Sequence, residues 1–141
     1  MIFRIFQNKT VLITGHTGFK GSWLAMWLNS LGAKVVGVAL EPPSQPSHFE
    51  VAELSGFLEN HVLDIRKGDA LKELVSQTQP DFIFHLAAQA LVRLSYDDPV
   101  ETYQTNAIGT LNLLEALRPL EKKCATVLIT SDKCYNNVEW V

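Results

Sequence analysis

Short apolar runs alternate with longer amphipathic segments along the chain, and their order predicts the secondary structure. Residues 10–14 (TVLIT) are rich in β-branched side chains and end at a glycine, which is typical of a strand. Residues 19–31 repeat large apolar side chains at helical spacing, and Gly32 favours a helix end there. Residues 34–40 (KVVGVAL) are apolar on both faces, like a parallel strand covered on two sides. The proline-rich residues 41–47 predict a loop.

The same alternation continues through the rest of the chain. We expect strands at residues 60–65, 81–87 and 125–130, and helices at residues 69–78 and 99–118. The last helix opens with Asp-Pro-Val-Glu, which combines a capping acid, a proline at the first helical position and a glutamate at the third. Strands separated by helical crossovers indicate an α/β fold with a doubly wound parallel sheet.

Length, composition and charge restrict the class of protein. The 141 residues fit one domain, residues 1–141, and 47% hydrophobic with 19% charged residues is a globular balance. The net charge of -3 and the lack of any long basic run argue against a nucleic-acid partner. The longest apolar stretch, residues 35–40, is too short to span a membrane, and the first ten residues show no secretion signal. We therefore expect a cytoplasmic protein that binds no membrane.

Metal binding is not predicted. The two cysteines, Cys124 and Cys134, have no histidine at the spacing of metal ligands, so we interpret both as reduced thiols.

A glycine-rich turn joins the first predicted strand to the first predicted helix. Residues 15–21 (GHTGFKG) have the spacing G-x-x-G-x-x-G. Gly15 permits a tight turn, Gly18 leaves room for a pyrophosphate to approach the backbone, and Gly21 lets the helix pack close to the strand. The amino terminus of the helix then offers unpaired N–H groups to the phosphates. This context predicts dinucleotide binding.

Other residues of the turn and helix have two interpretations each. His16 and Lys20 could bind the phosphates or could be solvated loop residues. Phe19, Trp23 and Trp27 recur every four residues, and such an aromatic stripe is most simply the core face of the helix.

Several motifs together resemble one enzyme family. They are GHTGFKG at residues 15–21, Asp64-Ile65-Arg66, HLAAQ at residues 85–89, Asn106 with Gly109-Thr110, and TSDKCY at residues 130–135. The set is similar to the extended short-chain dehydrogenases/reductases, and within them to the sugar-nucleotide 4,6-dehydratases. The resemblance implies a Rossmann-type sheet, truncated after about the fifth strand, with NAD as the cofactor.

The resemblance also implies which residues contact the cofactor. Asp64 and Ile65 would flank the adenine, although Asp64 could instead cap a turn after the third strand. Residues at the end of the fourth strand would border the ribose and nicotinamide, although small residues there also suit tight packing. Asn106 would have a catalytic duty or a structural hydrogen bond to nearby backbone. The full cofactor-binding set is Gly15, His16, Thr17, Gly18, Phe19, Lys20, Gly21, Asp64, Ile65, Leu86, Ala87, Ala88, Gln89 and Asn106.

The implied reaction converts CDP-glucose to CDP-4-keto-6-deoxyglucose, a step of deoxysugar biosynthesis. The resemblance implies that Thr130 hydrogen-bonds the sugar 4-hydroxyl, that Asp132 protonates the departing 6-hydroxyl, and that Lys133 stands where relatives carry a glutamate base. Residues 130–133 could instead be a polar strand end that turns into a loop. Two other functions stay open: a non-catalytic dinucleotide-binding module, and a sugar-nucleotide epimerase. An epimerase has no use for the Asp132-Lys133 pair.

Two features depart from the family pattern. Ala39 and Leu40 stand where NAD-selective enzymes often place an acid, so the choice of NAD over NADP follows from the resemblance alone. The Tyr-x-x-x-Lys pair of the family is absent, because no tyrosine has a lysine four residues later. We therefore expect this chain to be the amino-terminal part of the enzyme and to be inactive alone.

The resemblance further implies a homo-oligomer, a dimer or tetramer. The predicted helix at residues 99–118 would pack against its twin in a second copy. It carries one apolar stripe, formed by Val100, Tyr103, Ala107, Leu111 and Leu114. A solvent-facing surface helix is the alternative.

Overall fold

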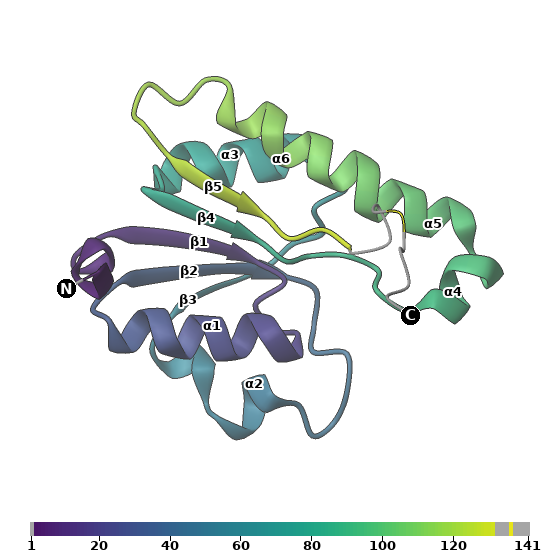
Figure 1. Cartoon of the computed structure of the whole chain (residues 1–141), viewed down its shortest axis with the longest axis horizontal. Helices are drawn as coiled ribbons and strands as arrows, with labels where there is room; N and C mark the ends of the chain where they lie inside the picture. The colour runs from purple at the N-terminus through teal and green to yellow at the C-terminus, as the bar shows by residue number, and fades with distance from the viewer. Residues whose placement is uncertain (1, 132–135, 137–141) are drawn as a thin grey trace.

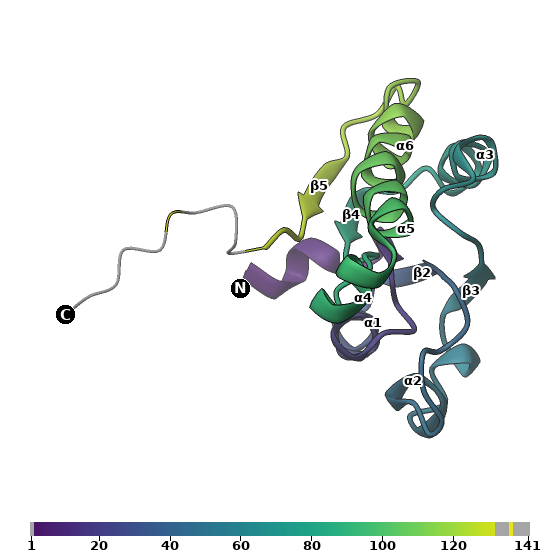
Figure 2. The same ribbon diagram turned by 90° about the vertical axis from the view of Figure 1, so that its right-hand side faces the viewer.

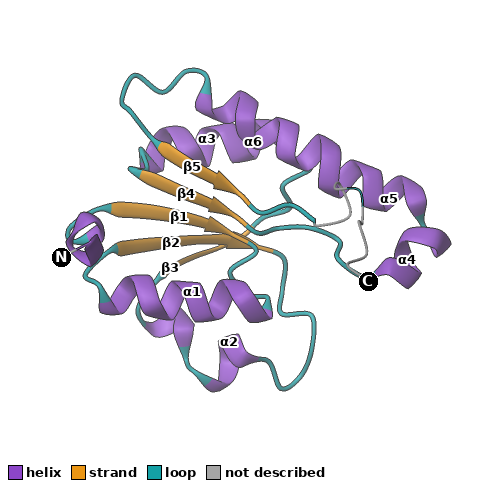
Figure 3. Ribbon diagram, in the orientation of Figure 1, coloured by secondary structure: helices purple, strands orange, loops and turns teal. Residues whose placement is uncertain are grey.

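One parallel sheet of five strands organises the chain, as the computed structural model shows for residues 2–131 and 136. The strands are β1 (Thr10–Thr14), β2 (Lys34–Ala39), β3 (Glu59–Val62), β4 (Phe82–His85) and β5 (Ala125–Leu128). Their spatial order is β3-β2-β1-β4-β5, and each pair is parallel (Figures 1 and 3). The predicted doubly wound parallel sheet is confirmed.

Helices cover both faces of this sheet. One face carries α1 (Phe19–Ser30) and α2 (His48–Val51), and the other carries α3 (Gly68–Thr78) and α6 (Gly109–Leu117) (Figures 1 and 2). The remaining helical segments are η1 (Ile2–Phe6), η2 (Leu54–Gly56), α4 (Val92–Asp97), α5 (Pro99–Tyr103) and the π-helical turn η3 (Gln104–Ile108). The predicted helix at residues 99–118 is thus a continuous run of α5, η3 and α6.

Alternation along the strands separates two apolar layers. In β1, Leu12 faces the α3 and α6 side, where it packs with Ile83 and Leu113. Val11 and Ile13 face the α1 side, where Leu28 belongs to the same cluster. All of these side chains are at most 1% exposed. Because each central strand is buried on both faces, its middle residues are apolar, and polar residues stand at one or both of its ends.

The strand order places a crevice above the middle of the sheet. β1 connects through α1 to β2 on one side, whereas β4 and β5 lie on its other side. The connections therefore diverge between the carboxyl ends of β1 and β4, which is where ligands of such sheets bind.

Some predicted strands end earlier than expected. The third strand ends at Val62 rather than at residue 65. Asp64 starts a turn in which its Oδ1 accepts a hydrogen bond from the Arg66 backbone N–H at 2.9 Å. Such a side-chain bond competes with the sheet ladder.

The aromatic stripe of α1 is not in the core, so that prediction is wrong. Phe19, Trp23 and Trp27 are 72%, 49% and 51% exposed. The buried residues of the helix are instead Gly21, Ser22, Ala25 and Leu28. Small side chains let α1 lie close to the sheet, which turns the bulky aromatic rings outward. Trp23 stacks on His48 of α2, with ring centroids 4.3 Å apart.

The short helix α2 was not predicted, although the sequence contains its signal. The Ser47 hydroxyl accepts a hydrogen bond from the Glu50 backbone N–H at 3.1 Å, and the Glu50 carboxylate accepts one from the Ser47 N–H at 3.2 Å. This reciprocal pair is a capping box, readable as Ser-x-x-Glu.

Among the described residues, no helix combines the length and apolarity needed to cross a membrane.

Candidate functional site

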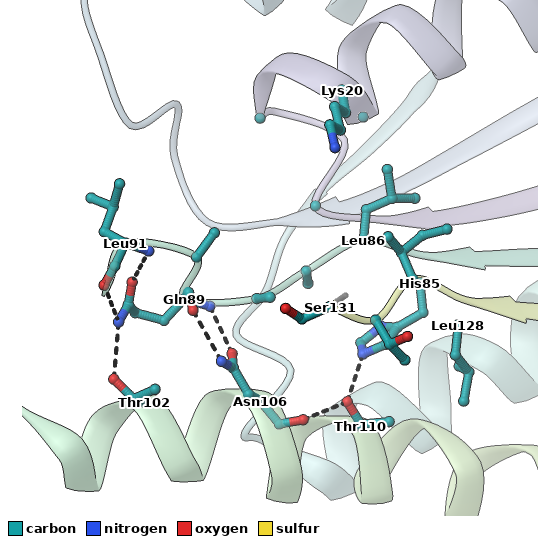
Figure 4. Close-up of a pocket in the computed structure, with 18 of the residues that line it drawn as sticks. Lys20, His85, Leu86, Gln89, Leu91, Thr102, Asn106, Thr110, Leu128 and Ser131 are labelled. Atoms are coloured by element: carbon teal, nitrogen blue, oxygen red, sulfur yellow. Dashed lines mark hydrogen bonds between the residues drawn. The ribbon is translucent and has the colours of Figure 1, made fainter. Parts of the chain in front are cut away.

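A cavity of about 1070 Å³ lies at the carboxyl end of the sheet (Figure 4). Four segments line it: the glycine turn with the start of α1, the chain that follows β4, one side of the α5 to α6 run, and the chain that follows β5. The lining residues are Gly15, Gly18, Phe19, Lys20, Gly21, His85, Leu86, Ala87, Ala88, Gln89, Ala90, Leu91, Val92, Ser95, Thr102, Asn106, Thr110, Leu128, Ile129, Thr130 and Ser131. Its position coincides with the crevice that the strand order creates.

The glycine turn has the geometry that its spacing predicts. Gly15 has a φ of +77°, and its N–H donates to the Val38 carbonyl oxygen at 2.7 Å. A Cβ at Gly21 would overlap the Gly15 carbonyl oxygen, so only glycine lets α1 begin this close to the turn. A Cβ at Gly18 would meet nothing nearer than the Gly15 oxygen at 3.3 Å, so the backbone there is open to the cavity.

His16 and Thr17, the two residues after Gly15, attach the turn to the sheet and are not among the residues that line the cavity. His16 is fully buried, and its Nε2 lies 2.6 Å from Asn60 Oδ1 on β3. Burial lowers the pKa of His16, and the bond to Asn60 opposes this shift. The Thr17 hydroxyl donates to the Leu40 carbonyl oxygen at 2.9 Å. The interpretation of His16 as a solvated loop residue is wrong, because its buried ring anchors the turn to the sheet. Its contact with the cofactor phosphates stays a prediction.

Lys20 and Phe19 are placed differently. Both are exposed, and both line the cavity at the start of α1. Figure 4 shows the Lys20 side chain extending from the helix toward the cavity. Among the described residues that line the cavity, Lys20 is the one with a charged side chain. It lies at the amino-terminal end of α1, which favours anions.

The chain after β4 is held by hydrogen bonds from distant residues. The Ala87 N–H donates to Thr14 Oγ1 at 3.1 Å. Asn106 binds the backbone of Gln89 twice, since its Oδ1 accepts from the Gln89 N–H at 2.8 Å and its Nδ2 donates to the Gln89 oxygen at 3.0 Å (Figure 4). Of the two roles that the sequence left open for Asn106, the structural hydrogen bond is the one observed.

The side chain of Gln89 is also fully engaged. Its Nε2 donates to the Leu91 oxygen at 3.1 Å and to Thr102 Oγ1 at 2.9 Å. Its Oε1 accepts from the Leu91 N–H at 2.6 Å. Gln89 therefore shapes the wall of the cavity, and its predicted contact with the nicotinamide side stays a prediction.

Asp64 and Ile65 do not line this cavity. The Asp64 carboxylate accepts from Arg66 Nε at 2.8 Å and forms an ion pair with its guanidinium at 2.6 Å. The hydrogen bond from Arg66 lowers the pKa of Asp64. Ile65 is 4% exposed and packs in the core against Gly109 of α6. The structure thus shows the turn cap and the core contact, and the predicted adenine contacts stay predictions.

The predicted catalytic segment is described only in part. Thr130 and Ser131 line the cavity beyond the end of β5. Asp132 and Lys133 lie outside the described residues.

Several residues that line the cavity are outside the set predicted from the sequence, and His85 is the most deeply hydrogen-bonded of them. His85 is 3% exposed, and both of its ring nitrogens lie within hydrogen-bond distance of a hydroxyl, from Thr14 and from Thr110. The available signal was a histidine at the end of an otherwise apolar strand, where burial requires polar partners.

Comparison with known proteins gives consistent matches over most of the chain. The family model described as GDP-mannose 4,6 dehydratase matches residues 12–141. The chain is 52% identical over 136 residues to CDP-glucose 4,6-dehydratase of Salmonella typhimurium, with 96% of this chain and 38% of that protein covered. It is 33% identical over 132 residues to CDP-paratose 2-epimerase of Salmonella typhi, with 92% and 38% covered.

A solved structure has the same arrangement. UDP-glucose-4-epimerase from Stenotrophomonas maltophila, with bound NAD and formylated UDP-arabinopyranose, superposes with a TM-score of 0.81 at 27% identity, covering 94% of this chain and 40% of that one. The chain spans about two fifths of the length of these relatives. The matches confirm the predicted resemblance to dehydratases and epimerases of sugar nucleotides.

Proposed function

The chain belongs to the GDP-mannose 4,6 dehydratase family, and from this premise we propose that it forms the cofactor-binding part of an NAD-dependent 4,6-dehydratase acting on CDP-glucose. The observation that carries the proposal is a single cavity extending from the glycine turn to Thr130. The 52% identity to the Salmonella typhimurium CDP-glucose enzyme supports the choice of substrate.

The residues of the turn fit a dinucleotide. The open backbone at Gly18 permits close approach of a pyrophosphate. No side chain of the described residues caps the first turn of α1, so its N–H groups are available to an anion. Lys20 adds a positive charge at the same end. NAD, when bound, supplies the acceptor for a hydride that is later returned to the sugar.

The other end of the cavity suits the sugar. Ala87 and Ala88 present small side chains and backbone beside the ribose and nicotinamide, and the Thr130 hydroxyl hydrogen-bonds the 4-hydroxyl of glucose. Asp132 protonates the 6-hydroxyl as it leaves, because hydroxide is a poor leaving group, and Lys133 assists removal of the C5 proton. These roles of Asp132 and Lys133 rest on the sequence resemblance.

An epimerase is the second candidate. The structural match to UDP-glucose-4-epimerase and the 33% identity to CDP-paratose 2-epimerase favour it. The higher identity to a dehydratase and the Asp132-Lys133 pair favour dehydration.

We also propose a homodimer through the α5 to α6 run. Val100, Tyr103, Leu111 and Leu114 of its apolar stripe are 63%, 67%, 49% and 40% exposed. The buried residues of α6 lie on another face and include Gly109, Leu113 and Ala116. An exposed apolar stripe beside a separate core face supports helix-to-helix packing between copies.

Calorimetric titration of NAD tests the cofactor assignment. Wild-type chain should bind NAD, and Gly18→Val should abolish binding because its side chain fills the approach to the backbone. Gly56→Val is the matched control, since a Cβ at Gly56 meets nothing within 4 Å. Equal affinity of wild type and Gly18→Val would remove the cofactor assignment.

A chimera tests the reaction. We expect no turnover by the 141-residue chain, because it holds no Tyr-x-x-x-Lys pair. Joined to the remaining part of the Salmonella typhimurium relative, it should convert CDP-glucose to the 4-keto-6-deoxy product.

Asp132→Asn in the chimera should slow elimination by about 10²- to 10⁴-fold, the usual contribution of general acid catalysis. Epimerised product without loss of water would instead support the epimerase.

A further inference from the structure

His85 connects three elements beneath the cavity. It ends β4, and its Nδ1 lies 2.7 Å from Thr14 Oγ1 at the end of β1. Its Nε2 lies 2.9 Å from Thr110 Oγ1 on α6. Figure 4 shows the ring between the strand and the helix, with Thr110 directly below it.

The hydroxyl partners determine which ring nitrogen carries the hydrogen. Thr110 Oγ1 lies 2.7 Å from the Asn106 carbonyl oxygen, which can only accept, so the Thr110 hydroxyl donates its hydrogen there. Thr110 must therefore accept from the Nε2–H of His85. Thr14 Oγ1 already accepts from the Ala87 N–H, so its own hydrogen is available for Nδ1. Nε2 therefore carries a hydrogen, and in the neutral ring Nδ1 accepts from the Thr14 hydroxyl.

The surroundings favour this neutral form. Both hydrogen-bond partners of the ring are uncharged, and Lys20 is the charged side chain that lines the same cavity among the described residues. Burial lowers the pKa of His85, and no carboxylate of the described part of the chain opposes that shift.

The hydrogen bonds form one relay that holds the cavity wall at two points. It runs from the Ala87 N–H through Thr14, His85 and Thr110 to the carbonyl oxygen of Asn106. The side chain of Asn106 then binds the backbone of Gln89. The same relay thus fixes the beginning and the end of residues 87–89.

We propose that His85 is a positioning residue for the nicotinamide half of the dinucleotide. Through its hydrogen bonds to Thr14 and Thr110, it fixes the backbone of residues 87–89 in the position that leaves room for the nicotinamide riboside of the cofactor. This inference rests on the proposed function, since it assumes that NAD occupies the cavity. The adenosine and pyrophosphate half binds at the glycine turn, which is supported by other contacts.

Comparing NAD with ADP separates the two halves. ADP reaches the glycine turn and lacks the nicotinamide riboside. Thr110→Val keeps the shape of the side chain and removes the acceptor of the His85 N–H, so NAD affinity should fall about 10-fold while ADP affinity stays within about twofold. Thr110→Ser retains the hydroxyl and should restore NAD affinity.

The outcomes distinguish this inference from the proposed function. If wild type binds neither NAD nor ADP, the proposed function fails. If wild type binds both, and Thr110→Val either leaves NAD affinity unchanged or weakens both ligands equally, the positioning role is wrong.

A second measurement tests the relay on the unaltered protein, so its result does not depend on whether the Thr110 variant folds. Long-range ¹⁵N–¹H spectra of the histidine rings report which nitrogen carries the hydrogen. We expect His85 to be neutral with the hydrogen on Nε2 at neutral pH. A hydrogen on Nδ1, or on both nitrogens, would overturn the relay.

Discussion

Two walls of the same cavity are built by opposite means. The glycine turn depends on missing side chains, since a Cβ at Gly15 would lie 2.8 Å from the Ala87 nitrogen and one at Gly21 would overlap the Gly15 oxygen. The wall after β4 depends on polar side chains 17 to 73 residues away in sequence, from Thr14 and Asn106. The glycine turn, residues 15–21, is the steric wall, and it should tolerate no added side-chain atoms at Gly15 or Gly21. The chain after β4, residues 86–90, is the polar wall. It should tolerate small changes of side-chain shape but not the loss of a hydrogen-bond donor or acceptor.

The largest combined loss of stability and NAD affinity should come from adding one methyl group to the steric wall. Gly21→Ala forces α1 away from the turn, and overpacking of this kind costs about 1–3 kcal/mol. Because the phosphate-facing N–H groups move with the helix, NAD affinity should fall about 100-fold or more. Thermal unfolding and calorimetric titration measure the two effects.

Gly56→Ala provides the control for the intrinsic effect of replacing glycine, because its Cβ would be in open space. If Gly21→Ala resembled this control in both measurements, the turn would not be a steric wall.

A second steric contact tests the support beneath the turn. A Cβ at Gly37 of β2 would overlap the ring of His16. Gly37→Ala should therefore destabilise the wild-type chain by about 1–3 kcal/mol. In a His16→Ala background the same substitution should cost much less, because the ring is gone, which gives a coupling energy of about 0.5–3 kcal/mol in urea unfolding. An identical cost in both backgrounds would show that His16 does not fill this space.

The polar wall should respond more mildly and in a selective way. Asn106→Ala removes both bonds to the Gln89 backbone and should cost about 1 kcal/mol in the free energy of unfolding. Thr78→Val is the control, since Thr78 lies on α3, outside the cavity lining, and its hydroxyl donates to the Leu74 carbonyl oxygen at 2.7 Å. Both variants lose side-chain bonds to the backbone, but only Asn106→Ala should weaken NAD binding. Equal loss of NAD affinity in both would contradict the local role of Asn106.

The smallest effect concerns the pH dependence of stability, because one buried histidine belongs to the glycine turn and another ends β4. The pKa values of His16 and His85 are lowered from 6.5 by burial. The unfolded chain therefore binds more protons as the pH falls through 6.5, and stability decreases toward acid. Between about pH 7.5 and pH 6.5, each ring should account for at most about 0.4 kcal/mol. Urea unfolding of wild type and His16→Ala should show a smaller slope in the variant, and a flat profile in wild type would contradict the burial of both rings in their neutral form.

The sequence predicted the steric wall better than the polar one. The glycines at 15, 18 and 21 are close in sequence and between a strand and a helix, so their spacing alone indicates the turn. The bonds of Asn106 and His85 join residues far apart in sequence, and no local pattern identifies such partners. The aromatic stripe of α1 misled for a related reason: helical spacing shows that Phe19, Trp23 and Trp27 share a face, but the close approach permitted by Gly21 and Ala25 decides which face is buried.

The central claim is that one NAD molecule contacts both walls, and amide chemical-shift mapping during an NAD titration tests it most directly. The largest ¹⁵N–¹H shift changes should include both residues 17–21 of the turn and residues 86–90 after β4, with little change at Gly56. Changes confined to one wall, or centred on the exposed aromatic stripe of α1, would contradict the claim.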